Sequence, residues 1–198
     1  MEKIRWGIIG PGNIANNFAD GLKGSYSGQL VSIASKSEDR RKTFGDKYDI
    51  HPDFRFDSYE DIINSEHIDA IYISTPHTLH AEWTIKAAGK GKHILCEKPG
   101  AINFNEGKKI IDAVREAGVF YMEGFMYRCH PQIPKLVEII KNKMIGDVIS
   151  IETSFGFDMG KTIPDHRLFN KNLAGGGILD VGLYPISFSR LIAGVAIG

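Results

Sequence analysis

The chain has no excess of charge of either sign, because 24 Lys and Arg residues balance 24 Asp and Glu residues among 198. A protein that binds nucleic acid or an anionic membrane surface through its overall field needs a surplus of basic side chains. We therefore expect neither nucleic acid nor a membrane as its main partner. Hydrophobic residues make up 42% of the chain, enough for a sizeable core, so a folded globular protein is expected.

Cysteine is scarce and long apolar runs are absent. Cys96 and Cys129 form neither a CxxC pair nor a Cys/His cluster, so we expect no disulfide framework and no structural zinc site. The longest run without a charged or strongly polar residue, 191–198, is far shorter than the ~20 residues of a membrane helix. The apolar stretch after Lys3 and Arg5 is too short for a secretory signal core, which predicts a cytoplasmic protein.

Short β-rich runs alternate with amphipathic stretches over the first part of the chain, a pattern typical of a parallel sheet wrapped by helices. Apolar residues near a spacing of 3.6 predict the helices, as at Phe104, Gly107, Ile111 and Val114. The fold class is therefore α/β, with residues 1–122 forming a Rossmann-type doubly wound parallel sheet that binds a dinucleotide. The predicted strands are 3–9, 29–35, 69–74, 93–96 and 119–122, with a weaker one at 54–56.

The alternation of short strands and amphipathic helices ends after Met122. A predicted helix at 132–143 precedes the run 147–157, whose alternation of polar and apolar residues predicts a half-exposed antiparallel strand. A loop at 158–172 and three glycines precede a predicted helix at 179–192. One strand and two helices cannot bury the face of a sheet, so we interpret residues 123–198 as the incomplete start of an α+β substrate and dimerisation domain.

The segment 10–15, GPGNIA, matches the pattern GxGxxA between a predicted strand and a predicted helix. The first glycine of such a turn allows a tight bend, and the second lets a pyrophosphate approach the backbone. Free amides at the start of the helix then face the anion. A purely structural glycine turn is the alternative. The expected cofactor contacts here are Gly10, Gly12, Asn13, Ile14 and Ala15.

The coenzyme is predicted from the end of the second strand. An acid about 20 residues beyond the glycines would bind the ribose of NAD, but Ser35, Lys36 and Ser37 stand there, with Arg40 beyond them. Two hydroxyls and an ammonium group suit a 2′-phosphate. We therefore expect NADP(H) in preference to NAD(H), with NAD(H) left open. The alternative for Lys36 is a solvated residue at the start of a helix.

Ligands of open α/β sheets bind outside the carboxyl ends of the strands, so the loops there are candidates for the site. His77 and His80 have i, i+3 spacing, but no third ligand has a fixed spacing nearby, so we expect no metal. A surface ion pair is the alternative for Glu97 and Lys98, although Pro99 fixes the backbone that follows and favours an amine over the crevice. The further expected cofactor contacts are Thr75, Pro76, His80, Glu97 and Lys98.

Asp180 and Tyr184 lie four residues apart at the start of a predicted helix, so we expect their side chains to share one face. The glycines at 175–177 leave room for a ligand against that helix. The alternative is that Asp180 complements the helix dipole and that Tyr184 belongs to the core.

Taken together with the segment 127–131, YRCHP, these motifs resemble the Gfo/Idh/MocA oxidoreductase family, whose members use NAD(P) on sugars, polyols and related alcohols. With tyrosine at position 184, the chain resembles the branch of the family that contains dihydrodiol dehydrogenase, xylose dehydrogenase and glucose-fructose oxidoreductase. The resemblance implies that Lys98 and Tyr184 are a catalytic pair. It also implies that three residues orient the substrate hydroxyls: Asp180, Arg128 and His130.

The resemblance implies an NADP(H)-dependent oxidoreductase that transfers a hydride between nicotinamide and a hydroxyl of a sugar or cyclic diol. A nearby lysine would favour the phenolate of Tyr184, whose ordinary pKa is about 10. Family members continue beyond the equivalent of residue 198, so we expect nucleotide binding more than turnover from this chain, and a homo-oligomer once the second domain is complete. A catalytically silent dinucleotide-binding protein or truncated fragment is the alternative. A methyltransferase would have no reason to carry the segment 97–99, EKP.

Overall fold

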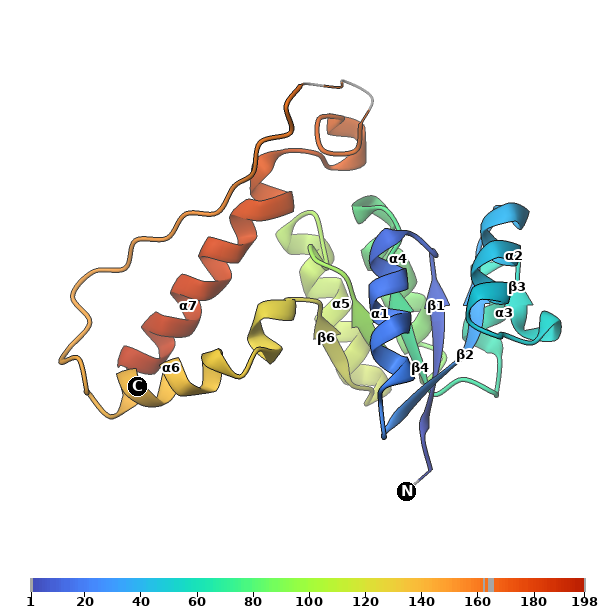
Figure 1. Ribbon diagram of the computed structural model, residues 1–198, viewed down its shortest axis with the longest axis horizontal. Coiled ribbons are helices and arrows are strands. Elements are labelled where there is room, and N and C mark those ends of the chain that lie inside the picture. The colour runs from blue at the N-terminus through green and yellow to red at the C-terminus, as the bar shows by residue number, and fades with distance from the viewer. Residues whose placement is uncertain (1, 162, 164–165, 198) are drawn as a thin grey trace. The chain divides into compact units, whose positions relative to one another are not determined.

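The computed structural model describes residues 2–161, 163 and 166–197. The chain separates into two compact units, residues 1–124 and 125–198. The first unit is a six-stranded parallel sheet in the order β3-β2-β1-β4-β5-β6, with helices on both faces (Figure 1). This confirms the predicted Rossmann-type fold, and each predicted strand lies within two residues of an observed one. The strands are β1 (Ile4–Ile9), β2 (Gly28–Ala34), β3 (Arg55–Phe56), β4 (Ala70–Ile73), β5 (His93–Cys96) and β6 (Tyr121–Glu123).

Alternate residues of each central strand enter two separate cores. Ile8 of β1 packs with α1 (Asn13–Lys23) and α2 (Glu38–Lys47). Its neighbour Ile9 packs on the other face with α3 (Tyr59–Asn64), α4 (His80–Ala88) and α5 (Phe104–Ala117). Because both faces are buried, the strands are nearly continuous apolar runs, which is why the sequence predicts them well. The strand order reverses between β2 and β4, on either side of β1, so a crevice for a ligand is expected there.

The buried face of α5 differs from the predicted one. Phe104 is 81% exposed and Ile111 is 40% exposed, whereas Ile110 and Val114 are buried. The reason is that Phe104 is the first residue of the helix, directly after the capping residue Asn103. The pair four residues apart that faces the sheet is therefore Ile110 and Val114.

The second unit contains α6 (Gln132–Lys141), a π-helical turn (Ile178–Gly182) and α7 (Leu183–Ile197). The strand expected at 147–157 is wrong: within residues 125–161, 163 and 166–197 this segment forms neither a helix nor a strand. An alternating pattern indicates a strand-like chain, but only a neighbouring strand can supply the hydrogen-bonded ladder. Ile149 is 92% exposed in this segment, and both Phe155 and Phe157 are more than half exposed.

Short 3-10 helices complete the described chain. They are Pro52–Phe54, His77–Leu79, Met126–Cys129 and Lys171–Leu173. Both cysteines are free: Cys96 is buried in β5, which raises the pKa of its thiol to about 12, and Cys129 is exposed.

An ion pair between Arg5 and Asp69 lies at the amino-terminal edge of the sheet. Arg5 of β1 donates to Asp69 from Nε at 3.0 Å, from Nη2 at 2.6 Å and from its backbone amide at 2.8 Å. The hydrogen bond from the Arg5 side chain lowers the pKa of Asp69. Asp69→Asn is expected to lower the free energy of unfolding at pH 7 by about 1 kcal/mol, a value discounted because a third of each side chain is exposed.

The pH dependence of this effect follows from the lowered pKa. The carboxylate stabilises the fold fully above its unfolded pKa of about 3.9, and the contribution disappears as the pH falls through the folded pKa. Urea unfolding of Asp69→Asn and the parent protein should therefore show a difference at pH 7 that shrinks in acid. Asp112→Asn, which removes an exposed pair with Lys108, is the control and should change little. A difference that grows in acid would contradict the assignment.

Candidate active site

The two glycines of the turn after β1 meet different requirements. Gly10 has φ +88, and a Cβ there would lie 3.0 Å from the backbone oxygen of Ser74. Gly12 has an ordinary extended backbone, with φ −94, and a Cβ there would meet nothing within 4 Å. Glycine at position 10 is thus required by the backbone and its close neighbour. Glycine at position 12 keeps open space at the start of α1.

The first turn of α1 suits an anion. Gly12 is the capping residue and provides no side-chain acceptor, and the first turn contains no acidic residue. The amides that begin the helix therefore lack a side-chain partner at its positive end, which is the arrangement that binds phosphate groups. Gly12 and Asn13 are exposed, Ile14 is partly buried, and Ala15 is fully buried against the sheet. These residues fit a diphosphate.

The end of β2 presents hydroxyl and cationic groups. Ser35 is buried, and its Oγ accepts from the amide of Ser37 at 3.2 Å. Ser37 caps α2, where its Oγ accepts from the amide of Arg40 at 3.4 Å. Lys36, Ser37 and Arg40 are exposed; no carboxylate lies among residues 35–37, and the exposed acids Glu38 and Asp39 follow in the first turn of α2. Such a set of donors fits a 2′-phosphate.

Glu97, directly after β5, is held by a residue that the sequence analysis missed. Tyr72 of β4 donates its phenolic hydrogen to Oε1 of Glu97 at 2.6 Å. Burial, together with the charge of Glu97, raises the pKa of Tyr72, so the phenol stays a donor. The ring of Phe18 stacks on the ring of Tyr72, with 4.1 Å between the ring centroids. No local pattern indicates this contact, because the two partners are 25 residues apart.

His80 is placed differently from the expectation. Its side chain is fully buried at the start of α4, with Nδ1 at 2.7 Å from the backbone oxygen of Pro99 and Nε2 at 2.8 Å from that of Thr75. Both ring nitrogens are therefore occupied by the protein, which does not support direct contact with a coenzyme. Within the described residues, the buried hydroxyl of Thr75 has no hydrogen-bond partner. The next residue, Pro76, is exposed.

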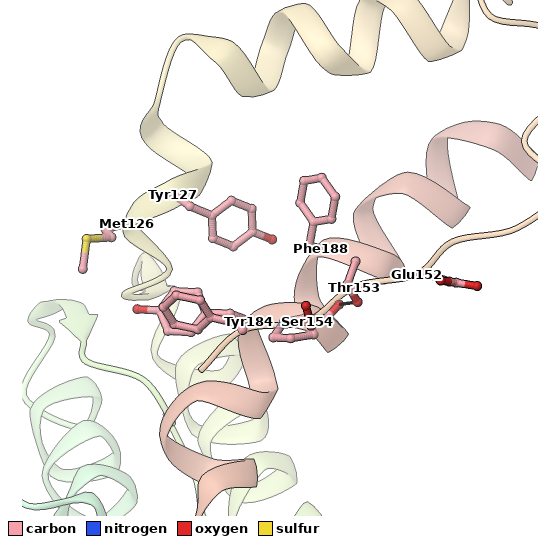
Figure 2. Close-up of a pocket in the computed structure, with 9 residues that line it drawn as sticks. Met126, Tyr127, Glu152, Thr153, Ser154, Tyr184 and Phe188 are labelled. Carbon is pink, nitrogen blue, oxygen red and sulfur yellow. Dashed lines mark hydrogen bonds between the residues drawn. The ribbon is translucent and has the colours of Figure 1, made fainter. Parts of the chain in front are cut away.

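Tyr184 lies in the second unit, in a cluster of aromatic rings. The centroid of its ring is 5.7 Å from that of Phe125, 6.2 Å from that of Tyr127 and 5.2 Å from that of Phe155. Figure 2 shows the adjoining hollow, whose volume is about 690 Å³. Its lining combines ring faces with a few polar groups. The lining residues are Met126, Tyr127, Glu152, Thr153, Ser154, Phe155, Tyr184, Pro185 and Phe188.

Asp180 and Tyr184 line different hollows, and their placement on one helix face stays a prediction. Asp180 is 7% exposed, accepts from Nη1 of Arg167 at 3.4 Å, and lines a separate hollow of about 170 Å³ beside Gly176 and Gly177. Residues 178–182 form a π-helical turn, and Tyr184 follows it as the second residue of α7.

The remaining predicted residues of the second unit lie before α6. Arg128 donates from Nη2 to the backbone oxygen and to Oγ of Ser187, each at 3.3 Å. The hydroxyl groups of Tyr127 and Ser187 are 2.8 Å apart. His130 is exposed, and its Nδ1 accepts from the amide of Gln132 at 3.2 Å. Ser187 is a second residue that the sequence analysis missed.

The predicted residues therefore divide between the two units: Lys98 belongs to the first and Tyr184 to the second. The catalytic pair stays a prediction. Within the described residues, no group of three or more His, Cys, Asp or Glu side chains could hold a metal ion. In the same residues, no helix is both long and apolar enough to cross a membrane.

Profiles of two protein families match the chain. The profile of the Gfo/Idh/MocA oxidoreductase family, NAD-binding Rossmann fold, matches residues 4–125. The profile of the Gfo/Idh/MocA C-terminal domain matches residues 133–197.

Individual proteins are also similar over nearly the whole chain. A D-xylose 1-dehydrogenase (NADP(+)) of Haloferax volcanii is 34% identical over 96% of this chain and 58% of its own length. A trans-1,2-dihydrobenzene-1,2-diol dehydrogenase of Mus musculus is 35% identical over 96% and 56%. The crystal structure of aldose-aldose oxidoreductase from Caulobacter crescentus, 28% identical, gives a TM-score of 0.90 over 98% of this chain and 58% of that one. The chain thus spans less than three fifths of these relatives.

Proposed function

Because the chain belongs to the Gfo/Idh/MocA oxidoreductase family, we propose that it acts as an NADP(H)-dependent oxidoreductase. The observation that carries the proposal is the open space above Gly12, at the start of a helix that has neither a capping side chain nor an acid in its first turn. The relatives named above support the choice of NADP(H), since one is named as an NADP(+) enzyme. When bound, the coenzyme supplies a carbon that accepts or donates hydride.

The residues of the first unit hold the coenzyme in this proposal. The turn from Gly10 to Asn13 binds the diphosphate through backbone amides. Lys36, Ser37 and Arg40 bind the 2′-phosphate, with the α2 cap keeping the Ser37 hydroxyl at the end of β2. The loop of Thr75 and Pro76 and the loop of Glu97 and Lys98 follow β4 and β5 at the same edge of the sheet.

Lys98 and Tyr184 carry the chemistry in this proposal. Tyr184 takes a proton from the substrate hydroxyl during oxidation and returns it to the carbonyl oxygen during reduction. The ammonium group of Lys98 favours the phenolate when the two come together. Asp180, Arg128 and His130 orient the other hydroxyls of the substrate.

The proposed substrate is a sugar or a cyclic diol. Xylose and a dihydrodiol appear in the names of two relatives. The hollow beside Tyr184 supports this class, because its aromatic faces suit the carbon face of a ring and Glu152, Thr153 and Ser154 suit hydroxyl groups. We further propose that residues 123–198 begin the substrate domain and that the whole protein is a homo-oligomer.

The choice of coenzyme can be measured directly. Fluorescence titration should show NADPH binding at least about tenfold more tightly than NADH, because the 2′-phosphate gains charge-assisted hydrogen bonds. Lys36→Ala should weaken NADPH and leave NADH unchanged, whereas Lys108→Ala, an exposed residue of α5, should affect neither. Equal affinities for the two coenzymes in the parent protein would remove the role of Lys36, and no binding of either would overturn the proposed function.

A further inference from the structure

His80 connects two loops at the carboxyl edge of the sheet. Its Nδ1 faces the backbone oxygen of Pro99, in the loop after β5, and its Nε2 faces that of Thr75, in the loop after β4. Both distances are below 3 Å and the side chain is fully buried, so water does not compete for either carbonyl. Because carbonyl oxygens only accept, a neutral ring donates to one of the two carbonyls at a time, and donating to both requires the imidazolium form.

The loop after β4 is joined in turn to the glycine turn. The hydroxyl of Ser74 donates to the backbone oxygen of Gly10 at 2.8 Å, and the amide of Ser74 donates to that of Ile9 at 3.0 Å. The backbone of Ser74 is also the atom group that a Cβ at Gly10 would meet at 3.0 Å. A continuous path of hydrogen bonds and backbone therefore runs from the diphosphate turn through Thr75 to His80.

The other end of the path is the loop that carries Lys98. Pro99 follows Lys98 directly, and its carbonyl is the group that faces His80. On the far side of Pro99, the amide of Gly100 donates to Oε1 of Glu123 at 2.7 Å. The backbone after Lys98 is thus held at two successive residues, once by His80 and once by Glu123.

We propose that His80 is a positioning residue that couples the diphosphate turn to the loop of Lys98. It keeps the amine in one place relative to the coenzyme site without touching the coenzyme itself. This inference rests on the proposed function for its consequence, but the coupling is a property of the first unit alone. A residue that only filled space in the core would act on stability and on no particular loop.

Variants with asparagine or glutamine at position 80 test the two hydrogen bonds of His80 separately. The amide nitrogen of asparagine stands as many bonds from Cα as Nδ1 does, so His80→Asn keeps a donor for Pro99. The amide nitrogen of glutamine corresponds in the same way to Nε2, so His80→Gln keeps a donor for Thr75. His80→Leu fills the space with no donor. The three variants form a matched series.

The first readout is a ratio of two modification rates. The rate at which a small acylating reagent modifies Lys98 is divided by the rate for Lys108 in the same sample, and both rates are measured by peptide mass spectrometry. Lys108 is an exposed residue of α5 and serves as an internal reference. His80→Leu and His80→Gln should change this ratio at least threefold, and His80→Asn should keep it near the parent value. The second readout is NADPH affinity by fluorescence, which should fall at least tenfold in His80→Leu and recover more in His80→Gln than in His80→Asn.

Each outcome decides the matter. An unchanged rate ratio in folded His80→Leu, or equal behaviour of the asparagine and glutamine variants, overturns the inference. If His80→Leu does not fold, the other two variants still decide it. If none folds, the parent protein labelled with ¹⁵N in histidine must show a ring N–H of His80 that exchanges slowly with solvent, and its absence overturns the inference. Failure of the parent protein to bind NADPH overturns the proposed function instead, and the rate ratio still tests the coupling.

Discussion

Gly12→Asp should abolish useful NADPH binding while making the fold slightly more stable. A carboxylate in the space above Gly12 would meet the diphosphate, and the repulsion at about 4 Å is worth ~1 to 4 kcal/mol, depending on exposure to solvent. With the added bulk, we expect the affinity to fall at least about a hundredfold. Aspartate also accepts well from the amides of a first helical turn, so α1 should gain a few tenths of a kcal/mol.

Two companion variants isolate the causes. Gly12→Asn caps the helix equally well but carries no charge, so it should weaken NADPH less than the aspartate does. Gly10→Ala places a Cβ at φ +88 and 3.0 Å from Ser74, so it should lower the free energy of unfolding by about 1–3 kcal/mol. Fluorescence titration and urea unfolding measure the two properties separately. Parent-like NADPH affinity in Gly12→Asp would place the diphosphate elsewhere.

Tyr184→Phe should remove most of the turnover and leave coenzyme binding unchanged. The variant loses only the hydroxyl, so its ring can still pack against Phe125 and Phe155. Proton transfer by a positioned side chain contributes about 10²–10⁴ to the rate, and kcat should fall by that factor. The measurement is the change in nicotinamide absorbance with a panel of aldoses and cyclic diols.

The matched control for this variant is Tyr26→Phe, since Tyr26 is 97% exposed and has no role in the proposal. It should turn over like the parent protein. A parent-like rate in Tyr184→Phe would overturn the assigned proton transfer. Tight NADPH binding by a parent protein that turns over no member of the panel would instead favour a silent dinucleotide-binding protein.

The sheet could be predicted from the sequence because its central strands are buried on both faces. Ile8 and Ile9, or Ile71 and Tyr72, enter opposite cores, and such neighbours read as continuous apolar runs. The two glycines of the turn were also predictable, because the pattern GxGxxA between a strand and a helix is a local signal. In the fold, Gly10 has a positive φ and Gly12 has open space around it.

The supporting contacts could not be predicted, because they join residues that only the fold brings together. His80 reaches Pro99 across 19 residues, and no periodicity encodes that contact. The segment 147–157 failed because a pattern can indicate which residues alternate but not whether a partner strand is present.

That unpaired segment has a consequence for handling the protein. Ile149, Phe155 and Phe157 are large apolar side chains, each more than half exposed, on a segment that belongs to no strand in the described part of the chain. A chain in this state is a template onto which another chain can add as a strand, and the tendency rises with concentration.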